Sequence, residues 1–194
     1  MRRKIIIIFL LTIMIILSSC FGGGDLRIKN KDLLLFGEDK VAYKSIKKVV
    51  EAIKEQDRDT LKSVFSKQAL AEADDFESSM DCLFEFIQGE IESLEIIKGL
   101  GIYEGKNDDG SGRSWKIIDS IGDIETSEQK YHISIQEVTK HSKEPERIGI
   151  SSLSIISAEY WNEDYVYRGD FGLPEDFETF GIVVDFQKDI KSGN

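Results

Sequence analysis

The chain has 194 residues and a formal net charge of −11 at pH 7, with 36 acidic side chains against 25 lysines and arginines. This length is that of one ordinary domain with a single core. The acidity disfavours nucleic acid and anionic lipid headgroups as partners, because clustered lysine and arginine side chains bind both.

The first 20 residues have the three parts of a bacterial secretory signal. Residues 2–4 are cations, residues 5–17 form an apolar run, and Ser19 precedes Cys20. The run is shorter than the roughly 20 apolar residues that a membrane-spanning helix needs. Because Cys20 follows Leu-Ser-Ser, the segment resembles a lipobox, and we expect cleavage between Ser19 and Cys20. A lipid on the Cys20 thiol would then anchor the protein to the extracytoplasmic face of the cell membrane.

The anchor defines the predicted domain organisation. Residues 1–19 are the signal peptide, and residues 20–37 are the lipidated cysteine, a glycine-rich tether and a leader. Residues 38–187 form one α+β domain, and residues 188–194 form a tail. The second cysteine, Cys82, lies among apolar residues and is predicted to fill part of the core.

Helical spacing dominates the first half of the domain. Ala42, Ile46, Val49, Val50 and Ile53 form the apolar stripe of a helix that starts near Glu38. Three further helices are predicted from their candidate N-caps, which are Asp57 or Asp59, then Ser66, then Asp74 or Asp75. Gly89 is the expected left-handed residue after the last of them.

The second half is predicted to be mostly strands. β-Branched or alternating residues occupy five segments, which are 91–103, 113–125 with a bulge at Gly122, 130–139, 147–157 and 181–186. A hairpin is also possible within residues 160–169. Helices followed by strands joined through hairpins predict an α+β fold, with the helices packed on a curved antiparallel sheet.

Two stretches carry a resemblance to a known family. The run AIKEQDRDTLKSVFSKQAL at residues 52–70 and the run LFEFIQG at residues 83–89, with the strand at 150–156, are similar to a group of Gram-positive lipoproteins called domain of unknown function 5104. The order of elements also resembles the nuclear-transport-factor-2-like, or cystatin-like, cone. The resemblance covers about residues 38–157 and implies the cone fold. It brings no catalytic residue, because the family has none assigned.

The sequence predicts no metal and no cofactor. His132 and His141 are the only histidines, and they have no cysteine pair beside them. The loop at residues 107–110 resembles a calcium loop at first sight, but the twelfth position is a lysine and the ligand pattern fails. His132 alternates with apolar neighbours and is expected to point away from the buried face.

Four residues are candidates to line a pocket between the helices and the concave sheet. They are the aromatic residues Tyr103, Trp115 and Tyr131, together with Asp119 as a buried acid. The alternative is that the aromatic residues only complete the core.

Three functions follow from these features. The first is a non-enzymatic lipoprotein that binds an unknown small molecule or protein. The second is an enzyme that uses Asp119 and a tyrosine as acid and base in the pocket. The third is an interaction module, such as an immunity protein for a secreted toxin or a homodimer, with His132, Ser134 and Gln136 on its contact face.

Overall fold

The computed structural model describes residues 25–29, 37–97, 101–106, 114–160 and 180–184. Several predicted features lie outside these residues. They are the signal peptide, Cys20 and the tether, the loop at 107–112, most of the possible hairpin at 160–169, and the tail. None of the helices among the described residues is long and apolar enough to cross a membrane.

The predicted helices are present, and local capping explains where three of them begin. The described helices are α2 (Glu38–Lys54), α3 (Arg58–Ser63), α4 (Lys67–Glu72) and α5 (Phe76–Phe86). The side chains of Asp57, Ser66 and Asp75 accept hydrogen bonds from the backbone N–H groups of the first turns of α3, α4 and α5. Gly89 has a φ of 80°, as expected, although α5 already ends at Phe86.

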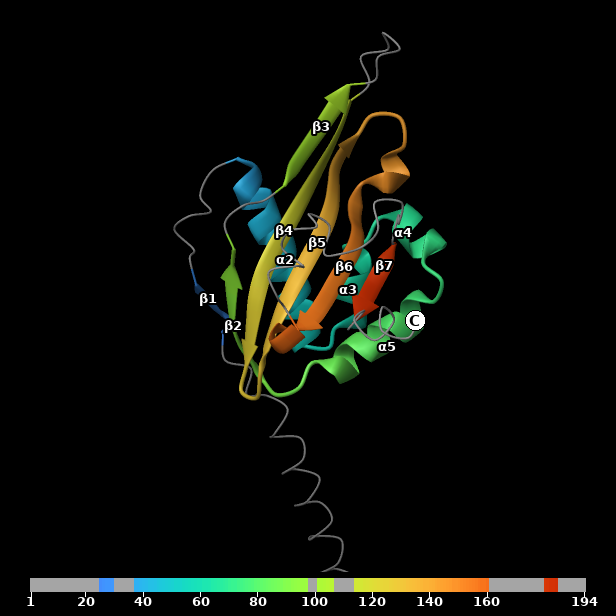
Figure 1. Ribbon diagram of the computed structural model, residues 1–194. Coiled ribbons are helices and arrows are strands. Elements are labelled where there is room, and N and C mark those ends of the chain that lie inside the picture. Colours follow the sequence, from blue (N-terminus) through green and yellow to red (C-terminus); the bar gives the residue numbers. More distant parts are fainter. Residues whose placement is uncertain (1–24, 30–36, 98–100, 107–113, 161–179, 185–194) are drawn as a thin grey trace, which may run out of the picture.

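The strands form one curved, unclosed sheet of seven strands (Figure 1). They are β1 (Arg27–Lys29), β2 (Ile91–Ile96), β3 (Ile102–Lys106), β4 (Ser114–Thr126), β5 (Lys130–His141), β6 (Gly149–Ser157) and β7 (Gly181–Val184). The order is β1-β2-β4-β5-β6-β7, and β3 also pairs with β4. β1 lies within the predicted leader and pairs with β2.

Three details of the sheet correct the sequence prediction. The sheet is mixed, because β1 pairs with β2 and β6 pairs with β7 in parallel. The segment 91–103 contains two separate strands, which pair with different halves of β4. Gly122 pairs regularly with Ile133 and does not form a bulge. A side chain at Gly122 would start 3.0 Å from Cδ1 of Ile46, so the glycine allows α2 to approach the sheet closely.

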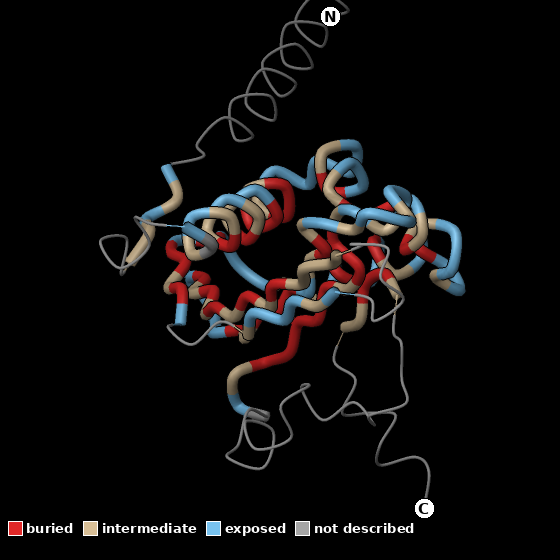
Figure 2. Tube along the Cα trace, turned by 90° about the horizontal axis from the view of Figure 1, so that it is seen from above, coloured by how far each residue is buried: buried red, intermediate tan, exposed pale blue. Residues whose placement is uncertain are grey.

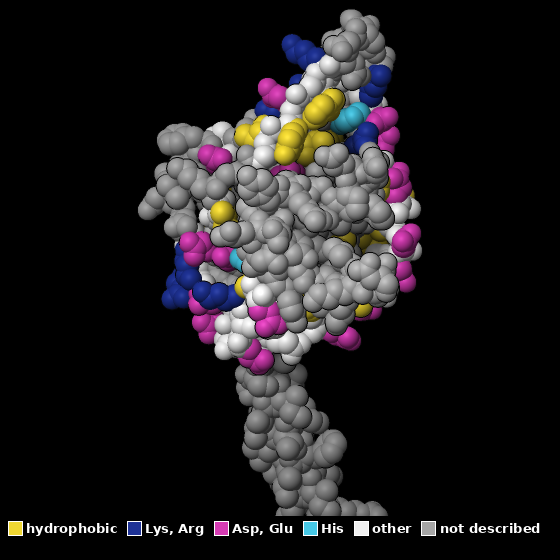
Figure 3. Space-filling model, viewed as in Figure 1, with side chains coloured by type: hydrophobic (Ala, Val, Ile, Leu, Met, Phe, Trp, Pro, Cys, Tyr) yellow, Lys and Arg dark blue, Asp and Glu magenta, His cyan; other side chains and the backbone are white. Residues whose placement is uncertain are grey.

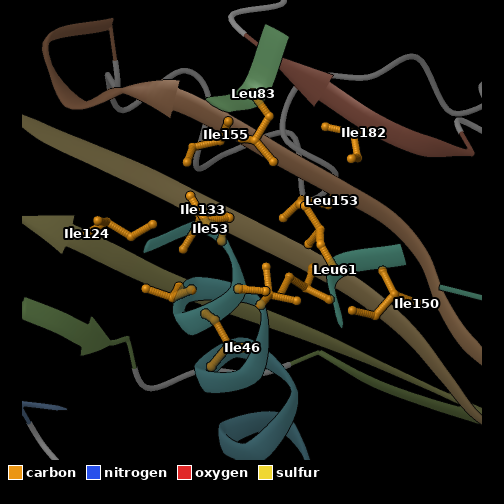
Figure 4. Packing of buried hydrophobic residues seen from close by; sticks show 14 of the residues in the cluster. Ile46, Ile53, Leu61, Leu83, Ile124, Ile133, Ile150, Leu153, Ile155 and Ile182 are labelled. Carbon is orange, nitrogen blue, oxygen red and sulfur yellow. The ribbon is translucent and has the colours of Figure 1, made fainter. Parts of the chain in front are cut away.

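The four described α-helices, α2 to α5, lie on one face of the sheet, which we call the helix-covered face (Figures 1 and 2). On β5, alternation directs Tyr131, Ile133 and Ile135 into the core, where they are fully buried. Figure 4 shows Ile46 and Ile53 of α2 directed towards this layer. One continuous apolar cluster therefore joins the helices to the strands.

The opposite side, which we call the far face, carries the alternate residues of β4 and β5. They are Asp119, Ile121, Asp123 and Glu125 on β4, with His132, Ser134 and Gln136 on β5. The far face faces the viewer in Figure 3.

Candidate functional site

The structure places the four predicted pocket residues on two different faces. Tyr131 points into the core on the helix-covered face. Trp115 and Asp119 alternate with Ile118 and therefore lie on the far face, and Tyr103 pairs directly opposite Ile117 on the same face. The expectation that all four line a pocket between helices and sheet is therefore wrong. Periodicity gave the alternation of β4 but not the side that the helices cover.

Tyr131 completes the core, which was the alternative interpretation of the aromatic residues. Its side chain is fully buried and meets the ring of Phe86 edge to face, with 5.4 Å between centroids. Its hydroxyl donates to the carbonyl of Phe86 at 3.1 Å and accepts from the backbone N–H of Gln88 at 2.7 Å. The ring and hydroxyl together fix the end of α5 against the sheet.

Asp119 lies in the middle of a group of polar residues on the far face. Its backbone N–H donates to the carbonyl of Gly101 at 2.8 Å. Its Oδ1 is buried and has no hydrogen-bond partner within the described part of the chain. Burial raises the pKa of the Asp119 carboxyl to about 6, although a hydrogen bond with the Gln136 side chain acts in the opposite direction. This acid therefore changes its charge close to neutral pH.

Gly101 brings Tyr103 and Asp119 together. The Tyr103 hydroxyl and Oδ2 of Asp119 lie 3.0 Å and 3.2 Å from the point where a side chain at Gly101 would begin. Cε2 of the Tyr103 ring is only 2.8 Å from that point, so any larger residue at position 101 would displace the ring. Tyr103 is also 50% exposed, so this hydroxyl is close both to the carboxyl and to solvent.

Gln136 extends the group to the next two strands. The hydroxyl of Ser151 donates to Oε1 and to the backbone carbonyl of Gln136, at 3.1 Å each. Because Oε1 accepts from Ser151, the amide NH2 is the group that hydrogen-bonds Asp119. Tyr103, Asp119, Gln136 and Ser151 thus form a polar strip across β3, β4, β5 and β6, and we use this name for them below.

Apolar side chains lie beside one end of the polar strip. The Trp115 ring covers Gly105, with Cε2 and Cζ2 each 2.7 Å from the point where a side chain there would begin. Figure 3 shows hydrophobic side chains gathered over β3 and β4 near a histidine. Tyr103 is exposed and Trp115 is half-buried. The strip therefore adjoins an aromatic surface that no described helix covers.

A histidine–carboxylate pair lies further along the same face. His132 points away from the helix-covered face, as predicted, but only 12% of its side chain is exposed, and its Nδ1 lies 2.5 Å from Oδ1 of Asp123. Ser134 is buried, whereas Gln136 is exposed. The contact face expected for an interaction module therefore offers only Gln136 of its three residues at the surface.

Sequence reasoning missed one half-buried acid on the helix-covered face. Glu137 follows the alternation of Ile133 and Ile135 and hydrogen-bonds Ser45 of α2. Burial raises its pKa, whereas the hydrogen bond from Ser45 acts in the opposite direction. Its Oε2 has no partner in the described segments. The alternation of β5 was the available signal, because Glu137 continues the series of residues that point to the helix-covered face.

Two other expectations concern cysteine and metal. Cys82 is exposed, so the prediction that it fills the core is wrong. It lies on the outer side of α5, whose inward positions are Phe76, Met80 and Leu83. Among the residues that the structure describes, no group of three or more His, Cys, Asp or Glu side chains is arranged to hold a metal ion.

Comparison with known proteins finds one family. A family model described as Domain of unknown function (DUF5104) matches residues 48–158, more than half of the chain. The matched segment contains the whole polar strip. No curated protein matches the chain.

Proposed function

The chain belongs to the family of domain of unknown function 5104, and from this premise we propose that it is a non-enzymatic, ligand-binding lipoprotein of the cell membrane. In this proposal a lipid on Cys20 holds the domain on the extracytoplasmic face. The polar strip and the adjoining aromatic surface contact the ligand, which is a small molecule or a segment of a protein.

The proposed anchor rests on the signal-like segment. Cations at positions 2–4, a short apolar run and Cys20 after Ser19 together support export and lipidation. Cells expressing the protein would be labelled with an alkyne-bearing palmitate analogue, and the purified protein would be analysed by mass spectrometry. We expect label on the wild type and none on Cys20→Ser, with Cys82→Ser as the control that keeps its label. A native protein that still begins at Met1 would contradict the anchor.

We also propose that the fold is a variant of the nuclear-transport-factor-2-like cone. Four helices on one face of a curved sheet, as well as the order of elements, support this. An experimental structure that superimposed poorly on members of that fold would contradict it.

The observation that carries the binding function is the arrangement of the polar strip. Asp119 has a buried oxygen without a partner in the described ranges, and it lies between two exposed side chains, those of Tyr103 and Gln136. A buried acceptor without a hydrogen bond lowers the stability of the fold. A ligand that donates a hydrogen bond to this oxygen would remove that cost.

The test is a binding screen read out at the strip. Isotope-labelled full-length protein in a neutral maltoside detergent would be titrated with cell-wall fragments, small metabolites and secreted proteins. We expect at least one of them to shift the backbone amide resonances of Gly101 and Asp119, and expect Asp119→Asn to weaken that binding. Asp123→Asn is the matched control on the same strand and face. A ligand that shifts only resonances elsewhere would contradict the site.

One observation favours a second candidate, an enzyme that transfers protons at Asp119. A carboxyl with a pKa of about 6 next to a tyrosine hydroxyl has the properties of a general acid or base at neutral pH. This candidate requires turnover of a bound compound, lost in Asp119→Asn, with a rate that changes near pH 6. Binding without turnover would support the first proposal instead.

A further inference from the structure

We infer that the polar strip binds its ligand through an organic cation, an ammonium or guanidinium group that supplies a counter-charge for Asp119, which no side chain among the described residues provides. This inference rests on the proposed binding function and specifies the chemical class of the ligand. The argument uses the charges on the far face of β4 and the hydrogen-bonding capacity of the strip.

The far face of β4 carries three acids, and two of them have basic partners. Asp123 contacts His132 at 2.5 Å. Glu125 pairs with Lys29 at 2.6 Å and with Lys130 at 3.9 Å. Asp119 is different, because the side chains that the structure describes around its carboxyl are the neutral Gln136 and Tyr103.

This difference matters because burial disfavours the ionised form of Asp119. Removing an ionised carboxylate from water costs free energy unless an opposite charge or several hydrogen bonds compensate for it. The single hydrogen bond from Gln136 compensates only in part, since the pKa of Asp119 stays raised. A bound cation would supply the remaining compensation, and a neutral ligand would supply less.

The hydrogen-bonding groups of the strip point to the same class. The carboxyl of Asp119 and the hydroxyl oxygen of Tyr103 are both acceptors, and they converge over Gly101. The nearby lysine on β4, Lys116, lies on the other face, where it pairs with Glu104 at 3.1 Å. Acceptors with no adjacent cation in the described part of the chain suit N–H donors that carry positive charge. Such charge-assisted hydrogen bonds are stronger than those between neutral groups.

Two more features favour a cation. The ring of Tyr103 is half exposed beside the carboxyl, and an aromatic face attracts ammonium and guanidinium groups. The net charge of −11 also gives the protein a negative field that concentrates small cations near its surface.

The experiment compares cations with neutral molecules of the same shape. Full-length labelled protein in maltoside detergent would be titrated with ethanolammonium and methylguanidinium, and separately with ethylene glycol and N-methylurea. The resonances to follow are the backbone amides of Gly101 and Asp119 and the side-chain amide of Gln136. We expect at least one cation to bind about tenfold more tightly than its neutral counterpart, and this preference to fall as salt is added.

Two variants assign the effect to the strip. Asp119→Asn keeps the shape and removes the charge, so cation binding should weaken about tenfold. Asp123→Asn removes a charge from the same face of the same strand and should leave cation binding within about twofold. Because Asp119→Asn removes a buried charge, we expect it to fold, and its amide spectrum verifies this.

The outcomes separate the inference from the proposed function. Equal binding of cations and neutral molecules, or cation binding unchanged in Asp119→Asn, would overturn the inference. If a neutral compound from the screen binds the strip and neither cation does, the inference fails while the binding function stands. If nothing in either experiment shifts the resonances of the strip, both fail.

Discussion

The hydroxyl of Tyr131, at the start of β5, accepts a hydrogen bond from the backbone N–H of Gln88 at 2.7 Å. It also donates to the carbonyl of Phe86, the last residue of α5. One buried side chain thus satisfies two backbone groups at the point where the chain leaves the helices and enters the sheet. This connection suggests a first test of what stabilises the fold.

Replacing Tyr131 by Phe should lower the free energy of unfolding by about 1–3 kcal/mol, because two backbone groups near the core lose their partner. The ring and its apolar contacts remain, so the loss reports mainly on the hydroxyl. Urea denaturation followed by circular dichroism measures it. The matched control is Tyr103→Phe, which removes a half-exposed hydroxyl and should cost less than about 0.5 kcal/mol. If both variants lost the same free energy of unfolding, the stabilising role given to the Tyr131 hydroxyl would be contradicted.

Asp119→Asn should change how stability depends on pH. Its pKa is raised from 3.8 to about 6 in the folded protein, so the unfolded chain ionises first as the pH rises. The wild type therefore loses stability between about pH 4 and pH 6, and the loss persists at higher pH. We expect Asp119→Asn to be more stable by about 1–2 kcal/mol at pH 7, after allowance for partial solvent screening. Denaturation at a series of pH values should show the two proteins converging below pH 4, and parallel curves would contradict the prediction.

Glu137→Gln should also stabilise the protein at neutral pH. Burial raises the pKa of Glu137, so ionisation opposes folding once the pH exceeds the pKa of the unfolded chain. The amide keeps a group able to hydrogen-bond Ser45 and carries no charge. We expect a gain of about 1 kcal/mol at pH 7, measured by chemical denaturation. Glu104→Gln, which removes an exposed partner of Lys116, is the control and should change stability by less than about 0.5 kcal/mol.

Gly149→Ala tests the junction between the short helices and β6. Gly149 has a φ of 127°, and a side chain there would begin 2.8 Å from the backbone nitrogen of Ser66. That nitrogen donates to the carbonyl of Ile150 at 2.9 Å, so it cannot move without weakening the junction. We expect a loss of about 3 kcal/mol, the sum of backbone strain and overlap.

Gly37→Ala is the matched control for this junction. Gly37 also has a positive φ, of 61°, but a side chain there would meet nothing within 4 Å. Backbone strain alone should cost about 1 kcal/mol. Thermal melts of both variants would show the difference. A Gly149→Ala protein no less stable than Gly37→Ala would mean that the overlap with Ser66 is relieved at little cost.

The sequence by itself determined the features that depend on near neighbours. Asp57, Ser66 and Asp75 cap helices through N–H groups three residues away, so short-range patterns predicted Ser66 directly and narrowed the other two caps to Asp57 or Asp59 and Asp74 or Asp75. The alternation in β5 likewise predicted that Tyr131 and His132 lie on opposite faces, because successive side chains in a strand point to opposite sides.

Only the tertiary structure decided which face of the sheet the helices cover, and with it the place of the candidate site. Alternation separates the residues of a strand into two sets but does not say which set faces the helices. β4 has some apolar residues in each set, so Trp115 and Asp119 could be assigned to either face. The same limit hid the convergence of Tyr103 and Asp119 over Gly101. It also hid the parallel pairing of the edge strand β1 with β2, and of the edge strand β7 with β6. These features depend on strand pairing and helix packing between residues far apart in the chain, and no local pattern records such contacts.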